Sequence, residues 1–93
     1  MERDIAEHAA SVLKAIAHPI RLQVIALLRD TEMCVGDMVQ ALNQPQAVVS
    51  HQLNLMKDKG VLTSRRDGTN VYYRIELKNV VNVLDCIDTH CKT

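Results

Sequence analysis

The stretch that decides the fold opens with Gln46-Ala47-Val48-Val49-Ser50-His51-Gln52-Leu53 and closes with Arg65-Arg66-Asp67-Gly68-Thr69-Asn70-Val71-Tyr72-Tyr73-Arg74. Apolar side chains recur in its first part at intervals of three or four residues, which is the spacing of one helix face. These residues are Val49, Leu53 and Met56, and the pattern continues to Gly60. In the second part, Asp67-Gly68 lies between two strand-like runs, 61–66 and 70–75, and is a strong hairpin signal. The stretch therefore predicts an amphipathic helix followed by a charged β-hairpin.

The helix face opposite this apolar stripe is polar. Its side chains can hydrogen-bond base edges or phosphates in the major groove of DNA. The candidates for contacts to base edges and phosphates are Gln46, Ser50, His51 and Asn54. The candidates for contacts to backbone phosphates alone are Lys57 on the helix and Arg65 and Arg66 on the hairpin. A polar helix face beside a basic hairpin suits a DNA groove.

A shorter helix is expected over residues 35–42, upstream of the first. The breaker Asn43-Gln44-Pro45 separates the two helices. Proline is tolerated at or just before the first turn of a helix, so Pro45 marks the start of the second helix, and Gly60 can end it. Two helices joined by a turn of this length predict a helix-turn-helix, with the hairpin as its wing.

Length and composition agree with a small DNA-binding domain. A chain of 93 residues predicts one domain over residues 1–93, with a core thin enough for dimerisation to help it. Phe and Trp are absent, so the core must be built from aliphatic residues and Met, and we expect a mostly helical fold. The net charge is zero, but residues 44–74 carry a net charge of +3 and the remainder −3. Positive charge therefore gathers where the motifs predict phosphate contacts.

Two other classes of protein are disfavoured. No continuous apolar run approaches the roughly 18 residues that a membrane span needs, and no signal sequence opens the chain. We therefore expect a cytoplasmic protein without a membrane partner. An enzyme would have to use the cysteines or the histidines, which are His8, His18, His51 and His90. No spacing places a nucleophile beside a base, and no glycine-rich phosphate loop occurs, so we expect no enzyme activity.

Three segments together resemble the ArsR/SmtB family of bacterial metal and metalloid sensors. They are Ala15-Ile16-Ala17-His18-Pro19-Ile20-Arg21-Leu22-Gln23-Val24-Ile25, then Val49-Ser50-His51-Gln52-Leu53 followed by Lys59-Gly60-Val61-Leu62, and finally Arg65-Arg66-Asp67-Gly68 with Val71-Tyr72-Tyr73-Arg74. They lie in the family's order and at its separations, so the match covers nearly the whole chain. The resemblance implies a mainly α fold with a β-hairpin wing, a winged helix-turn-helix with five helices. It also implies a transcriptional repressor that binds a palindromic operator in double-stranded DNA and is released by a signal.

The two ends of the chain are predicted to form a homodimer. Each terminal helix carries an apolar stripe that so small a domain cannot bury inside itself. The stripe of the first helix is Ile5, Ala9, Val12, Leu13 and Ile16, and that of the last helix is Leu77, Val80, Val81, Leu84, Ile87 and Cys91. Burial against a second copy fits two-fold dimers and palindromic operators.

The release signal is expected at the three cysteines, Cys34, Cys86 and Cys91. In a reducing cytoplasm they are thiols, metal ligands or redox sensors rather than structural disulfides. Thiolates suit arsenite, antimonite, zinc or copper(I), none of which the fold requires. The predicted effector is therefore a metal or metalloid ion, or a thiol-reactive compound.

Cys34 lies where the arsenite and cadmium sensors of the family carry two cysteines separated by one residue. Gly36 stands at the second position, so the site implied by the resemblance is incomplete. A purely structural role for Cys34 is also open, because small half-buried cysteines are common in cores.

The last helix offers a second candidate site. Cys86 and His90 are four residues apart, share a helix face and can bind one ion. The resemblance to the family's zinc sensors puts His90 on a ligand position. Other ligand positions of those sensors carry Leu77, Asn79 and Thr93. The hybrid site that remains consists of Cys86, His90 and Cys91, with Asp85 or Asp88 joining across the dimer.

Three hypotheses stay open beside a repressor released by a metal ion. The first is persulfide sensing, for which the family's sensors pair a cysteine of the second helix with one of the last helix, but Ala26 stands in the second helix here. Cys91 can still pair with Cys34 or Cys86, although cysteines five residues apart on one helix point about 140° apart. The second hypothesis is a regulator without a ligand, and the third is a winged helix that binds protein. Salt separates the third from a DNA binder, because phosphate binding falls steeply as salt rises.

Overall fold

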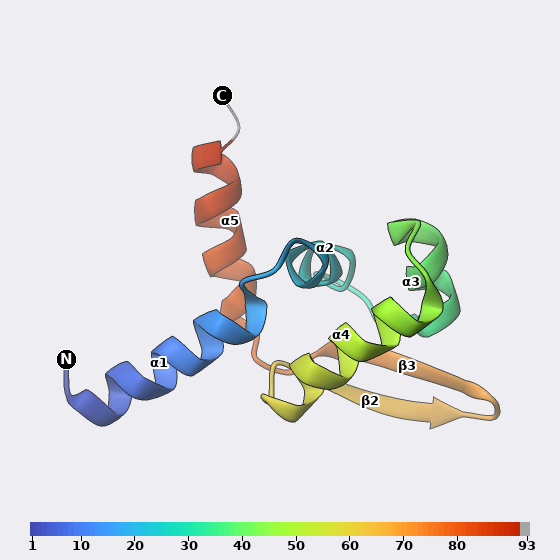
Figure 1. Ribbon diagram of the computed structural model, residues 1–93, viewed down its shortest axis with the longest axis horizontal. Helices are drawn as coiled ribbons and strands as arrows, with labels where there is room; N and C mark the ends of the chain where they lie inside the picture. The colour runs from blue at the N-terminus through green and yellow to red at the C-terminus, as the bar shows by residue number, and fades with distance from the viewer. Residues whose placement is uncertain (92–93) are drawn as a thin grey trace.

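Five helices and three strands are present in residues 1–91, the part of the chain that this computed structural model describes. In chain order they are α1 (Arg3–Ile16), α2 (Pro19–Leu27), β1 (Met33–Cys34), α3 (Val35–Leu42), α4 (Gln46–Asp58), β2 (Leu62–Asp67), β3 (Asn70–Ile75) and α5 (Asn79–Cys91). Helices α2, α3 and α4 form one body with the hairpin, whereas α1 and α5 project from it (Figure 1). The predicted winged helix-turn-helix with five helices is confirmed.

Strands β2 and β3 form the wing. They pair antiparallel from Leu62 opposite Ile75 to Asp67 opposite Asn70. The turn falls one residue later than the predicted Asp67-Gly68, because Asp67 still belongs to β2. Gly68 opens the turn with a φ of 64°, a left-handed conformation that glycine adopts without the Cβ clash of other residues. The hairpin predicted from the sequence is therefore confirmed, with a turn that uses its glycine.

Strand β1 extends the wing to a three-stranded sheet in the order β1-β3-β2. It pairs antiparallel with β3, so that Met33 lies opposite Tyr73 and Cys34 lies opposite Tyr72. Two residues are too few to show an alternating pattern, and the sequence therefore did not predict β1. The consequence for function is that the segment before α3 is tied to the wing.

The turn of the helix-turn-helix lies between α3 and α4, as predicted. Asn43 follows α3 in the left-handed conformation, with a φ of 52°, which asparagine tolerates better than most residues. Pro45 is the N-cap of α4, and its carbonyl accepts a hydrogen bond from the Val49 N–H at 3.1 Å. The start of α4 is thus set by Pro45.

The end of α4 corrects one part of the predicted apolar stripe. Gly60 is exposed rather than buried, because α4 ends at Asp58 and position 60 lies beyond the helix. Gly60 has a φ of 79° and donates its N–H to the Lys57 carbonyl at 2.9 Å. The next N–H, of Val61, reaches the Met56 carbonyl at 3.0 Å. These two hydrogen bonds form a Schellman motif, so Gly60 ends the helix, which was its other predicted role.

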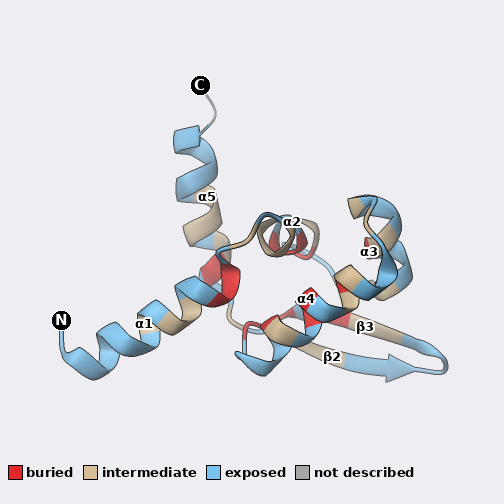
Figure 2. Ribbon diagram, in the orientation of Figure 1, coloured by how far each residue is buried: buried red, intermediate tan, exposed pale blue. Residues whose placement is uncertain are grey.

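The core lies where α2 and α4 meet the sheet, and burial falls off along α1 and α5 (Figure 2). The buried side chains of these central elements and of α5 are Val24, Ile25, Val49, Gln52, Leu53, Met56, Leu62, Tyr73, Ile75 and Val80. Within the two terminal stripes predicted to form the dimer, only Ile16 and Val80 are buried. Ile5, Leu13 and Ile87 keep 55%, 50% and 47% of their surface exposed. One copy of the chain therefore leaves apolar surface uncovered.

No single helix among the described residues is long and apolar enough to cross a membrane. Helices α1 and α2 reach that length and composition only when taken together, and they are bent by 88° where they join.

Candidate DNA-binding surface

The polar face of α4 is open to solvent. The apolar side chains of α4 pack into the core, and the helical period then turns the polar side chains outward. Gln46, His51, Asn54 and Lys57 are exposed, and Ser50 is half-buried. Gln52, on the opposite side of α4, is buried and is 8% exposed. The predicted base-contacting residues therefore share one accessible surface.

Two side-chain hydrogen bonds link α4 to the wing. Lys57 donates from Nζ to the Ser64 hydroxyl oxygen at 2.8 Å. The Tyr73 hydroxyl lies 3.5 Å from Asn54 Oδ1, a long contact. Tyr73 is buried, whereas Tyr72 is half-buried on the other face of the strand, as the alternation of a strand predicts. These contacts fix the helix and the wing relative to each other.

Arg65, a predicted phosphate contact, is held by Glu32. Arg65 Nε lies 2.9 Å from Glu32 Oε2 and 3.1 Å from Oε1, and Nη2 also contacts Oε1. The guanidinium carbon lies 4.6 Å from the centroid of the Tyr72 ring, within cation–π range. The hydrogen bond from Arg65 lowers the pKa of Glu32 and raises the pKa of Arg65. A DNA phosphate has to compete with Glu32 for this guanidinium.

Arg66 has a different environment. It is exposed and lies opposite Val71 in the hairpin. Strand alternation puts Arg66 on the same face of β2 as Ser64, the residue that accepts the hydrogen bond from Lys57. Arg66 forms no ion pair within residues 1–91. Of the two arginines predicted to contact phosphates, Arg66 is therefore the one that a phosphate can reach without displacing a carboxylate of the described residues.

Cys34 lies next to the predicted DNA contacts. It is the half-buried N-cap residue of α3. A groove of about 240 Å³ is lined by Cys34, Gln46 and Ser50 together with Thr69 and Asn70 at the tip of the wing. The structure thus brings one candidate sensing residue to the start of α4.

The other candidate sensing residues lie elsewhere. They are exposed on α5 and are Cys86, His90 and Cys91. Helix α5 lies on one side of α2 and α3 lies on the other (Figure 1). Cys34 precedes α3 as its N-cap residue. Residues 1–91 contain no group of three or more His, Cys, Asp or Glu side chains that could hold a metal ion. All three thiols are free. Thr93 lies outside the described residues. A complete metal site is therefore not formed within one copy of the described chain.

Asp85, one predicted bridging ligand, contacts Arg29. Arg29 Nη1 donates to Asp85 Oδ2 at 3.0 Å, and Nη2 contacts Oδ1. The hydrogen bond from Arg29 to Asp85, followed by the attraction between the charges, raises the pKa of Arg29. The interaction ties the segment after α2 to the middle of α5. A metal ion would have to compete with Arg29 for this carboxylate.

Comparison with known proteins gives consistent results. Residues 18–64 match the family described as bacterial regulatory protein, arsR family. The HTH-type transcriptional repressor SmtB of Mycobacterium tuberculosis is 37% identical over 86 residues, which cover 91% of this chain and 64% of the repressor. The chain thus spans just under two thirds of that relative. The transcriptional regulator MJ1325 of Methanocaldococcus jannaschii is 36% identical over 83 residues. The alignment covers 85% of this chain and 93% of that regulator.

Solved structures agree with the sequence matches. The transcriptional repressor BigR of Xylella fastidiosa has a TM-score of 0.89 and 26% identity, and the alignment covers 100% of this chain and 99% of BigR. The homodimeric winged helix-turn-helix DNA-binding domain Mb0332 of Mycobacterium bovis has a TM-score of 0.80 and 31% identity, with 96% of this chain and 84% of that domain covered. The fold, the order of elements and the sequence therefore point to one family.

Proposed function

Because this chain belongs to the ArsR family of bacterial regulatory proteins, we propose that it is a sequence-specific DNA-binding transcriptional repressor. The family and the relatives described above are regulators rather than enzymes. The observation that carries the proposal is the solvent-exposed polar face of α4. This face lies beside a basic wing, to which a hydrogen bond joins the helix. In this proposal α4 is the recognition helix.

Each predicted contact has a role in this proposal. The residues that reach base edges and nearby phosphates in the major groove are Gln46, Ser50, His51 and Asn54. Arg66 and Lys57 contact phosphates, and Arg65 does so after exchanging Glu32 for a phosphate. The phosphate contacts supply affinity and salt dependence, and the base contacts supply sequence preference. Residues 1–93 act as one DNA-binding domain.

The repressor works as a homodimer in the cytoplasm. The exposed apolar residues Ile5, Leu13 and Ile87 lie on the two helices that project from the body. Pairing α1 and α5 with those of a second copy removes this surface from water. A two-fold dimer presents two recognition helices to a palindromic operator.

The effector that releases the repressor is a soft metal or metalloid ion, such as arsenite, antimonite or zinc, or a thiol-reactive compound. The candidate residues are Cys34, Cys86, His90 and Cys91. Cys34 lies in the groove with Ser50 and the wing tip, so a group bound to its sulfur would meet the DNA contacts directly. Cys86, His90 and Cys91 are exposed on α5, where a second copy can complete a site. Either route lowers operator affinity by the effector's preference for the DNA-free conformation.

The test is fluorescence anisotropy with the reduced, chelator-treated protein and a labelled fragment of its own promoter. We expect binding that weakens steeply between 50 and 200 mM salt, by about 10³-fold or more if the dimer makes six phosphate contacts. Arsenite, zinc and an organic persulfide are then titrated separately, and one of them is expected to release the DNA. The triple variant Cys34→Ser, Cys86→Ser, Cys91→Ser is the matched control and should stay bound. Salt-insensitive binding would contradict the DNA part, and release of the triple variant would contradict the thiol part.

A further inference from the structure

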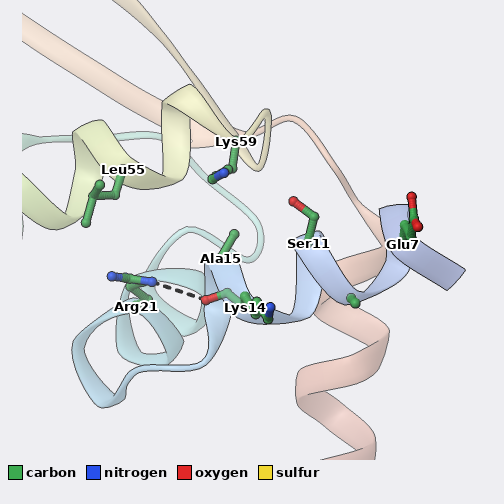
Figure 3. Close-up of a pocket in the computed structure, with 8 residues that line it drawn as sticks. Glu7, Ser11, Lys14, Ala15, Arg21, Leu55 and Lys59 are labelled. Carbon is green, nitrogen blue, oxygen red and sulfur yellow. Dashed lines mark hydrogen bonds between the residues drawn. The ribbon is translucent and has the colours of Figure 1, made fainter. Parts of the chain in front are cut away.

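Arg21 connects three helices. It lies in the first turns of α2 and is half-buried. Its Nε donates to Gln52 Oε1 of the recognition helix at 2.7 Å. Its Nη1 donates to the backbone carbonyl of Lys14 at 3.2 Å, the bond drawn in Figure 3. One guanidinium therefore joins the end of α1 to the middle of α4.

The bond to α1 satisfies a backbone carbonyl at the end of that helix. The last four carbonyls of an α-helix have no partner within the helix, and α1 ends at Ile16, so the Lys14 carbonyl is one of these groups. A cation there also faces the negative end of the helix dipole. Arg21 thereby holds the C-terminal turn of α1 in a defined place.

The bond to α4 is made on the buried face of the recognition helix. Gln52 is buried, and among the other buried side chains of the described residues only Tyr73 carries a polar group. Successive helix residues are about 100° apart, so Ser50 and Asn54, two residues away on either side, point about 160° away from Gln52. Holding Gln52 inward therefore holds the DNA-reading face outward.

Helices α1 and α4 also meet in the hydrophobic core, which includes buried residues of both. A groove of about 530 Å³ separates the two helices, and its lining includes Ser11 and Lys14 of α1, Leu55 of α4 and Lys59 beyond it (Figure 3). Outside the core, this groove keeps the facing surfaces of the two helices apart. Arg21, at one side of this groove, is the polar link across it.

We propose that Arg21 and Gln52 are positioning residues that set the distance and rotation of the recognition helix relative to α1, and thereby the operator half-site spacing that the dimer accepts. The inference rests on the proposed function, in which α1 lies at the dimer interface. If α1 is fixed by the partner copy, a rigid link from α1 to α4 fixes the separation of the two recognition helices. Loosening that link lets each recognition helix adjust to a shifted half-site.

The experiment uses the inverted repeat that the wild-type protein selects from a pool of randomised duplexes. Dissociation constants are measured for this repeat and for versions with one base pair added or removed between the half-sites. One base pair rotates a half-site by about 34° and moves it by about 3.4 Å, so we expect wild-type affinity to fall about tenfold or more. The ratio of the two dissociation constants is the spacing discrimination.

Two substitutions of Gln52 form a matched pair. Gln52→Met has a similar length but offers only a weakly accepting thioether, whereas Gln52→Glu keeps an oxygen acceptor for Arg21. We expect Gln52→Met to reduce the spacing discrimination by about threefold or more and Gln52→Glu to retain it. Arg21→Lys, which cannot reproduce the two-bond geometry of the guanidinium, is expected to reduce it as well. Arg3→Met, which removes an exposed arginine bonded only within α1, is the control and should retain it.

Circular dichroism at the assay temperature verifies that each variant is folded. If Gln52→Met does not fold, the measurement on Arg21→Lys decides the result. A purely stabilising role predicts that affinity for every spacing falls by one common factor. Unchanged spacing discrimination in Gln52→Met or in Arg21→Lys therefore overturns the inference while leaving the repressor function intact. Failure of the wild-type protein to select any repeat overturns both.

Discussion

The recognition helix α4 and the last helix α5 have the same length, 13 residues, yet the fold treats them differently. Helix α4 buries Val49, Gln52, Leu53 and Met56, whereas α5 buries only Val80. Both helices carry an apolar stripe at helical spacing, so their sequence patterns look alike. The difference lies in what covers each stripe. One copy of the chain buries the apolar stripe of α4 and leaves most of the stripe of α5 at least partly exposed.

The two helices belong to parts of the molecule with different proposed roles. The part that reads DNA in our proposal is fixed within one copy, by the core and by the bonds from Lys57 to Ser64 and from Arg21 to Gln52. The part that projects, α1 and α5, holds the exposed apolar residues and two of the three thiols. A signal at α5 can therefore change how two copies meet without first unfolding the reading surface.

The largest expected effect comes from truncating a buried side chain of α4. Leu53 is fully buried, and Leu53→Ala should lower the free energy of unfolding by about 2–5 kcal/mol, since it removes apolar contacts and leaves a cavity. The matched change on α5 is Ile87→Ala, at a half-exposed side chain, which should cost less than about 1 kcal/mol at protein concentrations low enough to keep the chain monomeric. Urea unfolding measures both. Equal losses would break the contrast between the helices.

The second effect concerns association. Ile87→Asp places a charge on the surface that we expect a second copy to cover, and an unpaired buried charge is strongly unfavourable. Sedimentation velocity should show a dimer dissociation constant raised by about 100-fold or more, which corresponds to about 2.7 kcal/mol. Asn82→Asp adds the same charge to an exposed position of the same helix and should leave the dimer intact. A dimer that tolerates Ile87→Asp would place the interface elsewhere.

The third effect concerns the wing. Arg66→Ala removes a proposed phosphate contact, for which no carboxylate of residues 1–91 competes through an ion pair, so the slope of log K against log salt should become shallower by about 1 for each bound copy. Sequence preference should not change, because phosphate contacts carry no base information. Arg3→Ala, on α1, is the charge-matched control and should leave the slope unchanged. Anisotropy titrations over a salt series distinguish the two, and identical slopes would remove Arg66 from the interface.

The smallest effect is electrostatic. Arg65 lowers the pKa of Glu32, so the ion pair contributes to stability above the carboxyl's ordinary pKa and is lost as the pH falls through the lowered value. The pair is solvent-exposed, so its contribution is small. An NMR titration should give a midpoint for Glu32 below that of a peptide, and Arg65→Ala should return it towards the peptide value. An unshifted midpoint in the wild-type protein would contradict this contact.

Local features of the fold could be predicted from the sequence, whereas long-range polar contacts could not. The stripe of α4, the breaker at Pro45 and the glycine of the wing each depend on neighbouring residues, and the structure has them close to where the sequence predicts. The Arg65–Glu32 and Arg21–Gln52 contacts join residues 33 and 31 positions apart. No local pattern encodes such pairs, because they exist only once the sheet and the helices have packed.

The candidate site divides in the same way. Helical period was enough to predict that Ser50, His51 and Asn54 share an accessible face, since a period needs no knowledge of the fold. It could not show that Arg65 is held by Glu32, or that Cys34 lines a groove with Ser50 and the tip of the wing. Glu32 and Cys34 lie beside or within β1, a strand of two residues that pairs with β3 of the wing.

The DNA-reading surface is built within one copy of the chain, and we propose that it binds the operator only when the projecting helices pair with those of a second copy. Sedimentation of the wild-type protein with a labelled inverted repeat tests it most directly. We predict that two copies bind each repeat in a single step and that a duplex with one half-site is bound much more weakly. One copy per repeat, with equal affinity for the half-site, would contradict it.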